Sequence, residues 1–394
     1  MKFSSLADRI GGEGVDAWEV HYDALARVDA GDEVIVLSVG QELEKLTPDP
    51  IVDSAVASLR AGRHHYTPVN GNENLRQAIV ERHLRNTGQS VSADQCVVFA
   101  GAQNALFSVA QVLLESGDEV ILSEPYYTTY PATFSATGAH LVSVPTRAEH
   151  GFQIDPDAIL AAVTPRTRAI VINSPNNPVG AVYERQRLDT LVRECARRDI
   201  WLISDEVYQE LLPENERCSA ASAPGADKVV VTVSSVSKSH RMTGWRIGWV
   251  VGPEILVTPL YNLCMCMAYG LPQFTMDAAV TALRDDFETA LDVGESMNRR
   301  RDIMLTHLES APGLSVHAAV GGMFVVLDVR DLGVSSQQFA RQLLDRYDVA
   351  VLPCDGFGST GSGLIRVSLC TTDEQIVVAS VRIVEYVKSL RASD

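Results

Sequence analysis

The sequence of 394 residues predicts an α/β fold: a mainly parallel sheet sandwiched by helices, with a smaller α+β unit beside it. Short apolar runs alternate with segments of helical periodicity from about residue 50 to 285, and longer helical stretches follow. The length favours two domains, since a single domain usually spans about 100–200 residues. We therefore expect a large domain over 48–285 and a small domain built from 1–47 and 286–394.

The two ends of the chain supply the elements expected in the small domain. An amphipathic stretch over 15–28 fits a helix, and a short apolar run over 34–37 follows it. Beyond residue 285 we expect helices over 285–309, 336–347 and from about 373, with strands at 323–329, 349–352 and 364–368.

Seven short apolar runs in the middle of the chain predict buried strands of a parallel sheet. They lie at residues 96–100, 119–122, 141–144, 169–172, 201–204, 229–233 and 248–251. Segments with helical spacing lie between most of these runs or beside them, and examples are 75–84, 104–114 and 184–196. Because parallel strands need crossover connections, this alternation predicts helices on both faces of the sheet.

Charge and cysteine usage exclude several classes of function. Lys and Arg total 33 against 50 Asp and Glu, which gives a formal charge of −17. Such a surface repels phosphate backbones and anionic lipids, so no nucleic-acid or membrane partner is expected. No apolar run approaches a membrane span, and the first residues lack an apolar signal core. The seven scattered cysteines predict neither a disulfide scaffold nor a metal site, and they favour the reducing cytoplasm.

Four of the predicted strands are followed by residues that can carry chemistry. These follow-on segments are 101–103, 173–180, 205–208 and 234–238, with 244–246 close behind the last. They supply a glycine turn, amides, a carboxylate, and a lysine with hydroxyls and an arginine. Each alone is explained by a helix cap or a solvated side chain. Because doubly wound sheets bind ligands at the carboxyl ends of their strands, their convergence on one edge predicts an active site.

Together these segments resemble those of the fold-type I pyridoxal-phosphate aminotransferases of class I/II. The resemblance runs from about residue 38 to 368. The most specific signal is S-x-S-K-x-x-x-x-x-G-x-R, from Ser235 to Arg246. The N-N-P-x-G loop at 176–180 and D-E-x-Y at 205–208 support it. The resemblance implies a pyridoxal 5'-phosphate enzyme that moves amino groups in a ping-pong cycle.

The resemblance also assigns the chemistry to particular residues. Lys238 holds the cofactor as a Schiff base and carries the proton between substrate Cα and cofactor. Asp205 keeps the pyridine nitrogen protonated, which makes the ring an electron sink. Tyr208 and Asn177 hydrogen-bond the phenolic oxygen of the ring, and Tyr127 stacks on its face.

Further matches imply a phosphate site and a substrate site. The phosphate is expected at the turn and helix start Gly101, Ala102 and Gln103, and at Ser235, Ser237 and Arg246. Arg366 matches the arginine that binds the substrate α-carboxylate, and the backbone of Gly40 and the side chain of Asn177 are expected beside it. An arginine inside an apolar strand needs an anionic partner, which a bound carboxylate supplies. Tyr66 matches a tyrosine that reaches the phosphate of a neighbouring subunit, which implies a homodimer.

Two departures from the family pattern lie close to the expected site. The loop 41–46 after Gly40 is one residue longer than in most relatives and lacks their first Pro and their Phe. This change predicts an altered side-chain pocket. Cys354 stands where relatives usually have Gly, and inert packing is the expected role for this thiol.

Within the family, the chain is most similar to the arginine:pyruvate transaminases, on segments 17–22, 238–245 and 266–270. An arginine substrate, with its guanidinium side chain, needs carboxylates at the pocket mouth. A related alternative is a modified arginine keto acid as the substrate, which the altered loop after Gly40 would suit. The acidic residues expected near the mouth are Glu13, Asp16, Glu19, Glu42 and Glu44, each of which is equally explained as acidic surface.

Other fates of the reaction remain open at this point. The same cofactor apparatus serves β/γ-elimination and oxygen-dependent oxidation of arginine. A non-catalytic regulator that senses the cofactor is a more remote alternative, because no basic helix-turn-helix segment precedes residue 48.

Overall fold

The computed structural model describes residues 2–11, 18–42, 44–285, 287–318 and 320–391. A seven-stranded sheet with the order β2-β8-β7-β6-β5-β3-β4 forms its larger part. Its strands are β2 (Cys96–Phe99), β3 (Glu119–Glu124), β4 (His140–Pro145), β5 (Thr167–Asn173), β6 (Trp201–Asp205), β7 (Val230–Ser235) and β8 (Gly248–Val251). Each of the seven predicted runs overlaps one of these strands. Every residue of β2, β3 and β8 is buried, which explains why β2 and β8 contain no charged or hydroxyl side chain.

One strand runs against the predicted direction. β8 pairs antiparallel with both β7 and β2, whereas the other neighbouring pairs are parallel. The expectation that residues 248–251 form a parallel strand is therefore wrong. The link from β7 to β8 holds only α10 (Val236–Ser239) and a short 3-10 turn, η7 (Thr243–Trp245). A parallel neighbour needs a longer crossover, so the chain turns back instead.

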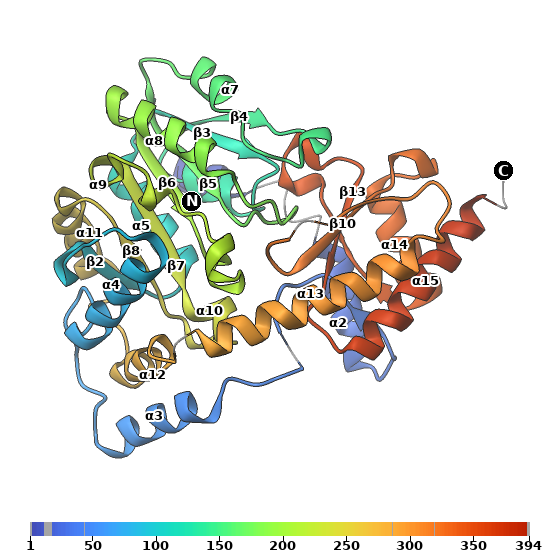
Figure 1. Cartoon of the computed structure of the whole chain (residues 1–394), viewed down its shortest axis with the longest axis horizontal. Coiled ribbons are helices and arrows are strands. Elements are labelled where there is room, and N and C mark those ends of the chain that lie inside the picture. Colours follow the sequence, from blue (N-terminus) through green and yellow to red (C-terminus); the bar gives the residue numbers. More distant parts are fainter. Residues whose placement is uncertain (1, 12–17, 43, 286, 319, 392–394) are drawn as a thin grey trace.

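Helices surround this sheet (Figure 1). α4 (Glu73–Thr87), α5 (Ala102–Leu113) and α8 (Arg185–Arg198) contain or overlap the segments predicted from helical spacing. The spacing did not single out α1 (Ser5–Ile10), α3 (Asp49–Arg60), α6 (Tyr130–Ser135), α7 (Pro156–Ala161), α9 (Ala226–Val229), α11 (Glu254–Met267) or α12 (Gln273–Leu283). α11 carries Pro259 in its interior, a residue that normally ends a helix.

Both chain ends meet in the second part of the molecule. A four-stranded sheet has the order β12-β13-β10-β9, and β1 pairs with β11 in a separate two-stranded sheet. The strands are β1 (Ile35–Val36), β9 (Ser315–His317), β10 (Phe324–Asp328), β11 (Val349–Ala350), β12 (Leu352–Pro353) and β13 (Leu364–Ser368). The helices are α2 (Glu19–Asp29), α13 (Glu288–Leu308), α14 (Ser336–Tyr347) and α15 (Asp373–Arg391).

The long helix α13 extends from the seven-stranded part toward α14 and α15 (Figure 1). The run 349–352, predicted as one strand, divides between β11 and β12, which belong to different sheets. The division into domains at residues 48 and 285 stays a prediction. No helix in the described ranges combines the length and the apolar character that a membrane span requires.

Candidate active site

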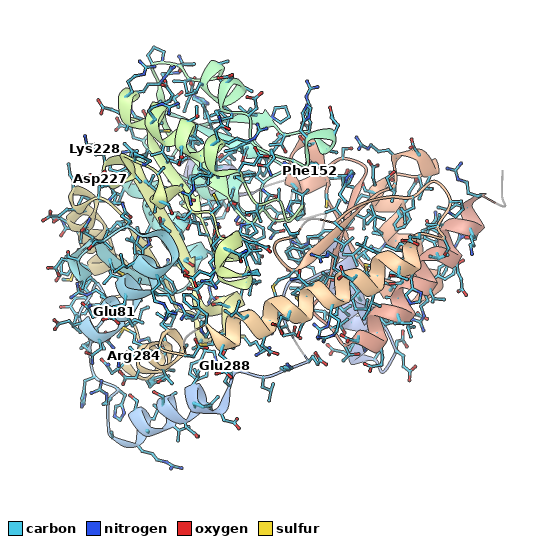
Figure 2. The ribbon with its side chains drawn as sticks, viewed as in Figure 1. Glu81, Phe152, Asp227, Lys228, Arg284 and Glu288 are labelled. Carbon is cyan, nitrogen blue, oxygen red and sulfur yellow. The ribbon has the colours of Figure 1, made fainter. Side chains whose placement is uncertain are left out.

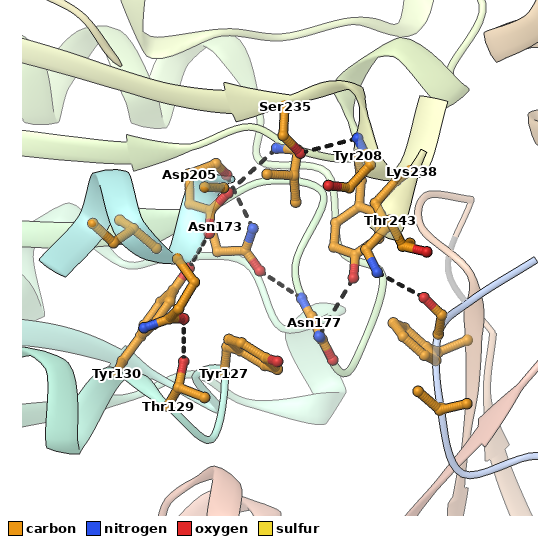
Figure 3. Close-up of a pocket in the computed structure, with 18 of the residues that line it drawn as sticks. Tyr127, Thr129, Tyr130, Asn173, Asn177, Asp205, Tyr208, Ser235, Lys238 and Thr243 are labelled. Atoms are coloured by element: carbon orange, nitrogen blue, oxygen red, sulfur yellow. Dashed lines mark hydrogen bonds between the residues drawn. The ribbon is translucent and has the colours of Figure 1, made fainter. Parts of the chain in front are cut away.

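A cavity of about 260 Å³ lies at the carboxyl ends of β5, β6 and β7 (Figure 3). This is the edge at which the sequence predicts a ligand site. Most of the predicted residues line it: Gly40, Ala102, Gln103, Tyr127, Asn177, Asp205, Tyr208, Ser235, Ser237, Lys238, Arg246 and Arg366. The structure thus brings together side chains from segments more than 300 residues apart in the chain. Gly101 is not among the lining residues, but it is in contact with the guanidinium of Arg246. Tyr66 lies outside this cavity, in a different surface pocket.

Lys238 projects into the cavity from α10, directly after β7 (Figure 3). Its Nζ donates a hydrogen bond to the carbonyl oxygen of Gly40 at 2.7 Å. Burial lowers the pKa of the Lys238 amine, and the guanidinium groups of Arg366 and Arg246 act in the same direction. An amine in this environment is free of its proton at a lower pH than an exposed lysine, as a nucleophile requires.

Asp205 is the last residue of β6 and is buried. The Tyr130 hydroxyl donates to its Oδ2 at 2.6 Å, and the Val207 N–H lies 3.3 Å from Oδ1. Burial raises the pKa of the Asp205 carboxyl to about 6, against the opposing effect of the Tyr130 hydrogen bond. A buried carboxylate that faces the cavity is suited to a protonated ring nitrogen.

Arg366 occupies the middle of β13 and is only 1% exposed. It donates through Nη1 to Asn177 Oδ1 at 2.9 Å and through Nη2 to the Ser38 carbonyl at 2.7 Å. Its Nε has no hydrogen-bond partner among the described residues. A buried cation with an unused donor calls for an anionic ligand, and a carboxylate matches the guanidinium fork.

A cradle of donors lies at the start of α5. Gly101 has φ +90°, and a Cβ there would stand 2.1 Å from Arg246 Nη2, so only glycine lets the guanidinium approach this turn. Arg246 is held by the carbonyls of Thr243 and Ala100, at 2.7 and 3.1 Å. The first amides of a helix lack intrahelical partners, so this end fits a phosphate. The chain therefore offers matching groups for each part of pyridoxal phosphate.

Several lining residues were not predicted: Trp18, Tyr130, Asn173, Thr243 and Phe324. Tyr130 and Asn173 could have been predicted, because they lie three and four residues from the predicted site residues Tyr127 and Asn177. Phe324 has no such signal, because its place depends on the packing of β10. A Cβ on Gly40 would meet the Phe324 ring at 2.5 Å, which explains the glycine.

The carboxylates expected at the pocket mouth have other surroundings. Glu42 and Glu44 are both bound by the buried guanidinium of Arg300 and do not line the cavity. Glu19 is exposed in the first turn of α2. Glu13 and Asp16, also predicted near the mouth, lie outside the described residues.

Cys354 is fully buried, and burial raises the pKa of its thiol to about 12. Because the thiolate is the reactive form, Cys354 is expected to resist alkylation in the native protein and to react only after denaturation. Peptide mapping by mass spectrometry after brief iodoacetamide treatment measures this. Modification of native Cys354 at the rate of a free cysteine would contradict the burial argument.

Comparison with known proteins agrees with this geometry. The family model "Aminotransferase class I and II" matches residues 12–383. The chain is 49% identical over 383 residues to the arginine–pyruvate transaminase of Pseudomonas aeruginosa, covering 97% of each chain. It is 34% identical over 360 residues to the aspartate/prephenate aminotransferase of Thermus thermophilus, covering 91% of this chain and 92% of that one. The structure of Thermus thermophilus aspartate aminotransferase with maleate superposes with a TM-score of 0.91 at 31% identity, covering 98% and 99%. The predicted fold class and family are confirmed: this chain belongs to the aminotransferases of class I and II.

Proposed function

We propose that this aminotransferase moves the α-amino group of L-arginine, or of a related guanidino amino acid, to a 2-oxo acid such as pyruvate. The observation that carries the choice of substrates is the 49% identity, over 97% of both chains, to an arginine–pyruvate transaminase. Enzymes of this family use pyridoxal phosphate. When it is bound, this cofactor supplies an electron sink for the negative charge left at the substrate Cα.

Substrate binding begins at Arg366. Its guanidinium holds the α-carboxylate of the amino acid, and Asn177 keeps the guanidinium in place through the 2.9 Å hydrogen bond. The ring of Phe324 lies 4.3 Å from the guanidinium carbon and closes off one face. This grip presents the Cα–H bond to Lys238 and excludes water from the reacting atoms.

Lys238 moves the proton. Its Nζ would hold the cofactor, and the same amine, once free, would take the proton from the substrate Cα and return it to the reacting group. The lowered pKa supports this role, because the amine is available as a base below the ordinary range of lysine. Asp205, held by Tyr130, would keep the ring nitrogen charged. Asn177 and Tyr208, which are in contact with each other, would hold the phenolic oxygen of the ring.

The remaining predicted residues hold the cofactor. Tyr127 supplies an aromatic face on the cavity wall, packed edge-on against Tyr130 with ring centroids 5.9 Å apart. The phosphate would be held by Gly101, Ala102, Gln103, Ser235, Ser237 and Arg246, and the lining of the cavity and the close approach of Arg246 to Gly101 support this assignment. The unpaired cysteines support a cytoplasmic location.

A homodimer completes the proposal. Tyr66 is 89% exposed and packs edge-on against Tyr269, outside the cavity of its own chain. If Tyr66 serves a neighbouring subunit, inactive Lys238→Ala and impaired Tyr66→Ala chains should complement each other when co-expressed. Each mixed dimer then contains one native site, and activity exceeds that of either variant alone. Activity equal to the average of the two variants would contradict a shared site.

The donor is tested by a panel of amino acids with pyruvate and with 2-oxoglutarate as acceptors, followed by chromatography of the products. The proposal predicts the highest kcat/KM for L-arginine among the donors, with one 2-oxo acid formed per amino group transferred. A preference for L-aspartate or an aromatic donor would keep the family and overturn the substrate.

A further inference from the structure

We propose that Arg300 is a positioning residue that holds segment 40–47 in place, so that the Gly40 carbonyl meets the Lys238 amine at the cavity wall. The described residues of this segment are 40–42 and 44–47. The inference rests on the proposed role of Lys238 in moving the proton. Arg300 stands in the middle of α13, the helix that links the two parts of the molecule (Figure 1).

The guanidinium of Arg300 is 0% exposed and binds three separate segments. Nη1 donates to Glu42 Oε2 at 2.9 Å and to the Leu369 carbonyl at 3.0 Å. Nη2 binds Glu44, and Nε donates to Asp373 Oδ1 at 3.2 Å. Leu369 directly follows β13, the strand that carries Arg366, and Asp373 is the first residue of α15. The Arg300 side chain therefore connects segment 40–47 to the end of β13 and to the start of α15.

A second ion-pair group holds the far end of the segment. Lys45 Nζ lies 2.7 Å from Asp292, which stands earlier on α13, and Arg241 binds the same carboxylate at 2.5 Å. Thr47 Oγ1 also donates to the Arg241 carbonyl at 2.8 Å. Arg241 comes three residues after Lys238. The segment is therefore fixed to α13 and to the stretch that carries the catalytic lysine.

The path from Arg300 to Lys238 is short. Glu42 is 3% exposed in its side chain and stands two residues after Gly40. Gly40 accepts the hydrogen bond from Lys238 at 2.7 Å. A carboxylate this deeply buried is tolerated only beside a cation. Without Arg300, Glu42, Glu44 and Asp373 would repel one another, and the Gly40 carbonyl would leave its place.

This arrangement gives Glu42 and Glu44 a role other than substrate recognition. Both carboxylates are neutralised by a guanidinium of the chain itself. They are therefore expected to affect cationic and neutral amino acids equally. Replacement of a residue that contacts the substrate side chain would instead change the ratio of kcat/KM for cationic and neutral amino acids.

The first test is limited trypsin cleavage of the holoenzyme at the bond after Lys45. Arg300→Met should speed release of the fragment 1–45 about tenfold or more, because a segment that opens more often is cut faster. The matched control is Arg299→Met. Arg299 is adjacent on α13 and binds the same Asp373 at 2.6 Å, but it is half exposed. Its loss should leave the cleavage rate at the wild-type value.

The second test measures proton transfer in the half-reaction with L-arginine and, separately, with L-alanine. Arg300→Met should slow both about 10- to 100-fold, as expected for a misplaced reacting group. The isotope effect of a Cα-deuterated donor should rise, KM should change less than kcat, and Arg300→Lys should recover part of the rate. If Arg300→Met fails to fold, the double variant Glu42→Gln, Arg300→Met is used in both tests instead. The added substitution removes the buried Glu42 charge that the loss of Arg300 would leave unpaired.

Wild-type protection from trypsin in Arg300→Met together with an unchanged isotope effect would overturn the proposal. A loss confined to L-arginine would also overturn it, because Glu42 and Glu44 would then contact the substrate. If the wild-type enzyme does not use L-arginine, the proposed substrate fails, whereas trypsin cleavage and the L-alanine reaction still test Arg300.

Discussion

Replacing Lys238 by alanine is expected to remove amino-group transfer almost completely. Lys238 lines the cavity together with Asp205, and its Nζ donates to the Gly40 carbonyl. In the proposed function this amine takes the proton from the substrate Cα. Proton transfer by a positioned group contributes about 10²- to 10⁴-fold, and loss of the nucleophilic amine adds to this. The measurement is the rate at which 2-oxo acid appears in a single turnover, with no acceptor present.

The matched control for this variant is Lys228→Ala. Lys228 is an exposed lysine of α9 on the surface of the same part of the molecule (Figure 2). This control should transfer amino groups at the wild-type rate. A Lys238→Ala enzyme that also kept the wild-type rate would remove this residue from the chemistry.

The second large effect is expected at Arg366. Arg366→Lys keeps a positive charge but loses the planar fork that donates to Asn177 and that, in the proposed function, also binds the substrate α-carboxylate. A charge-assisted hydrogen bond contributes about 1.5–3 kcal/mol, so kcat/KM should fall about 10- to 100-fold, mainly through a higher KM for the amino acid. Steady-state kinetics at saturating pyruvate measures this fall.

Arg341→Lys provides the comparison for Arg366→Lys. Arg341 pairs with Asp23 at 2.6 Å on the surface, where a single ion pair has little effect. Its kinetic constants should match those of the wild type. A normal KM in Arg366→Lys would show that the α-carboxylate binds elsewhere.

Much of the site could be predicted because its residues follow strands in a fixed order. Asp205 ends β6, Lys238 follows β7, and the turn at Gly101 follows β2, so sequence position alone brings them to one edge. The strong motif around Lys238 also placed Arg246. These positions depend on local turns and on the direction of parallel strands, both of which leave a signal in the sequence.

The rest depends on contacts between distant segments. Arg300 and Glu42 are 258 residues apart, and no periodicity or motif indicates that they meet in a buried ion pair. Glu42 and Glu44 were expected near the pocket mouth, where a guanidino substrate would need carboxylates, whereas their partner is a guanidinium of the chain itself. The hydrogen bond from Tyr130 to Asp205 was hidden for the same reason. The antiparallel direction of β8 does have a local signal, because the link after β7 is too short for a parallel crossover.

The most direct test of the account follows the nitrogen atom. L-Arginine carrying an isotopic label in its α-amino group is incubated with the enzyme and pyruvate, and the products are analysed by mass spectrometry with oxygen and ammonia monitored. The account predicts that labelled alanine and the 2-oxo acid of arginine accumulate in equal amounts over many turnovers, and that this accumulation requires pyruvate. Release of the label as ammonia, with or without oxygen uptake, would contradict amino-group transfer and favour elimination or oxidation instead.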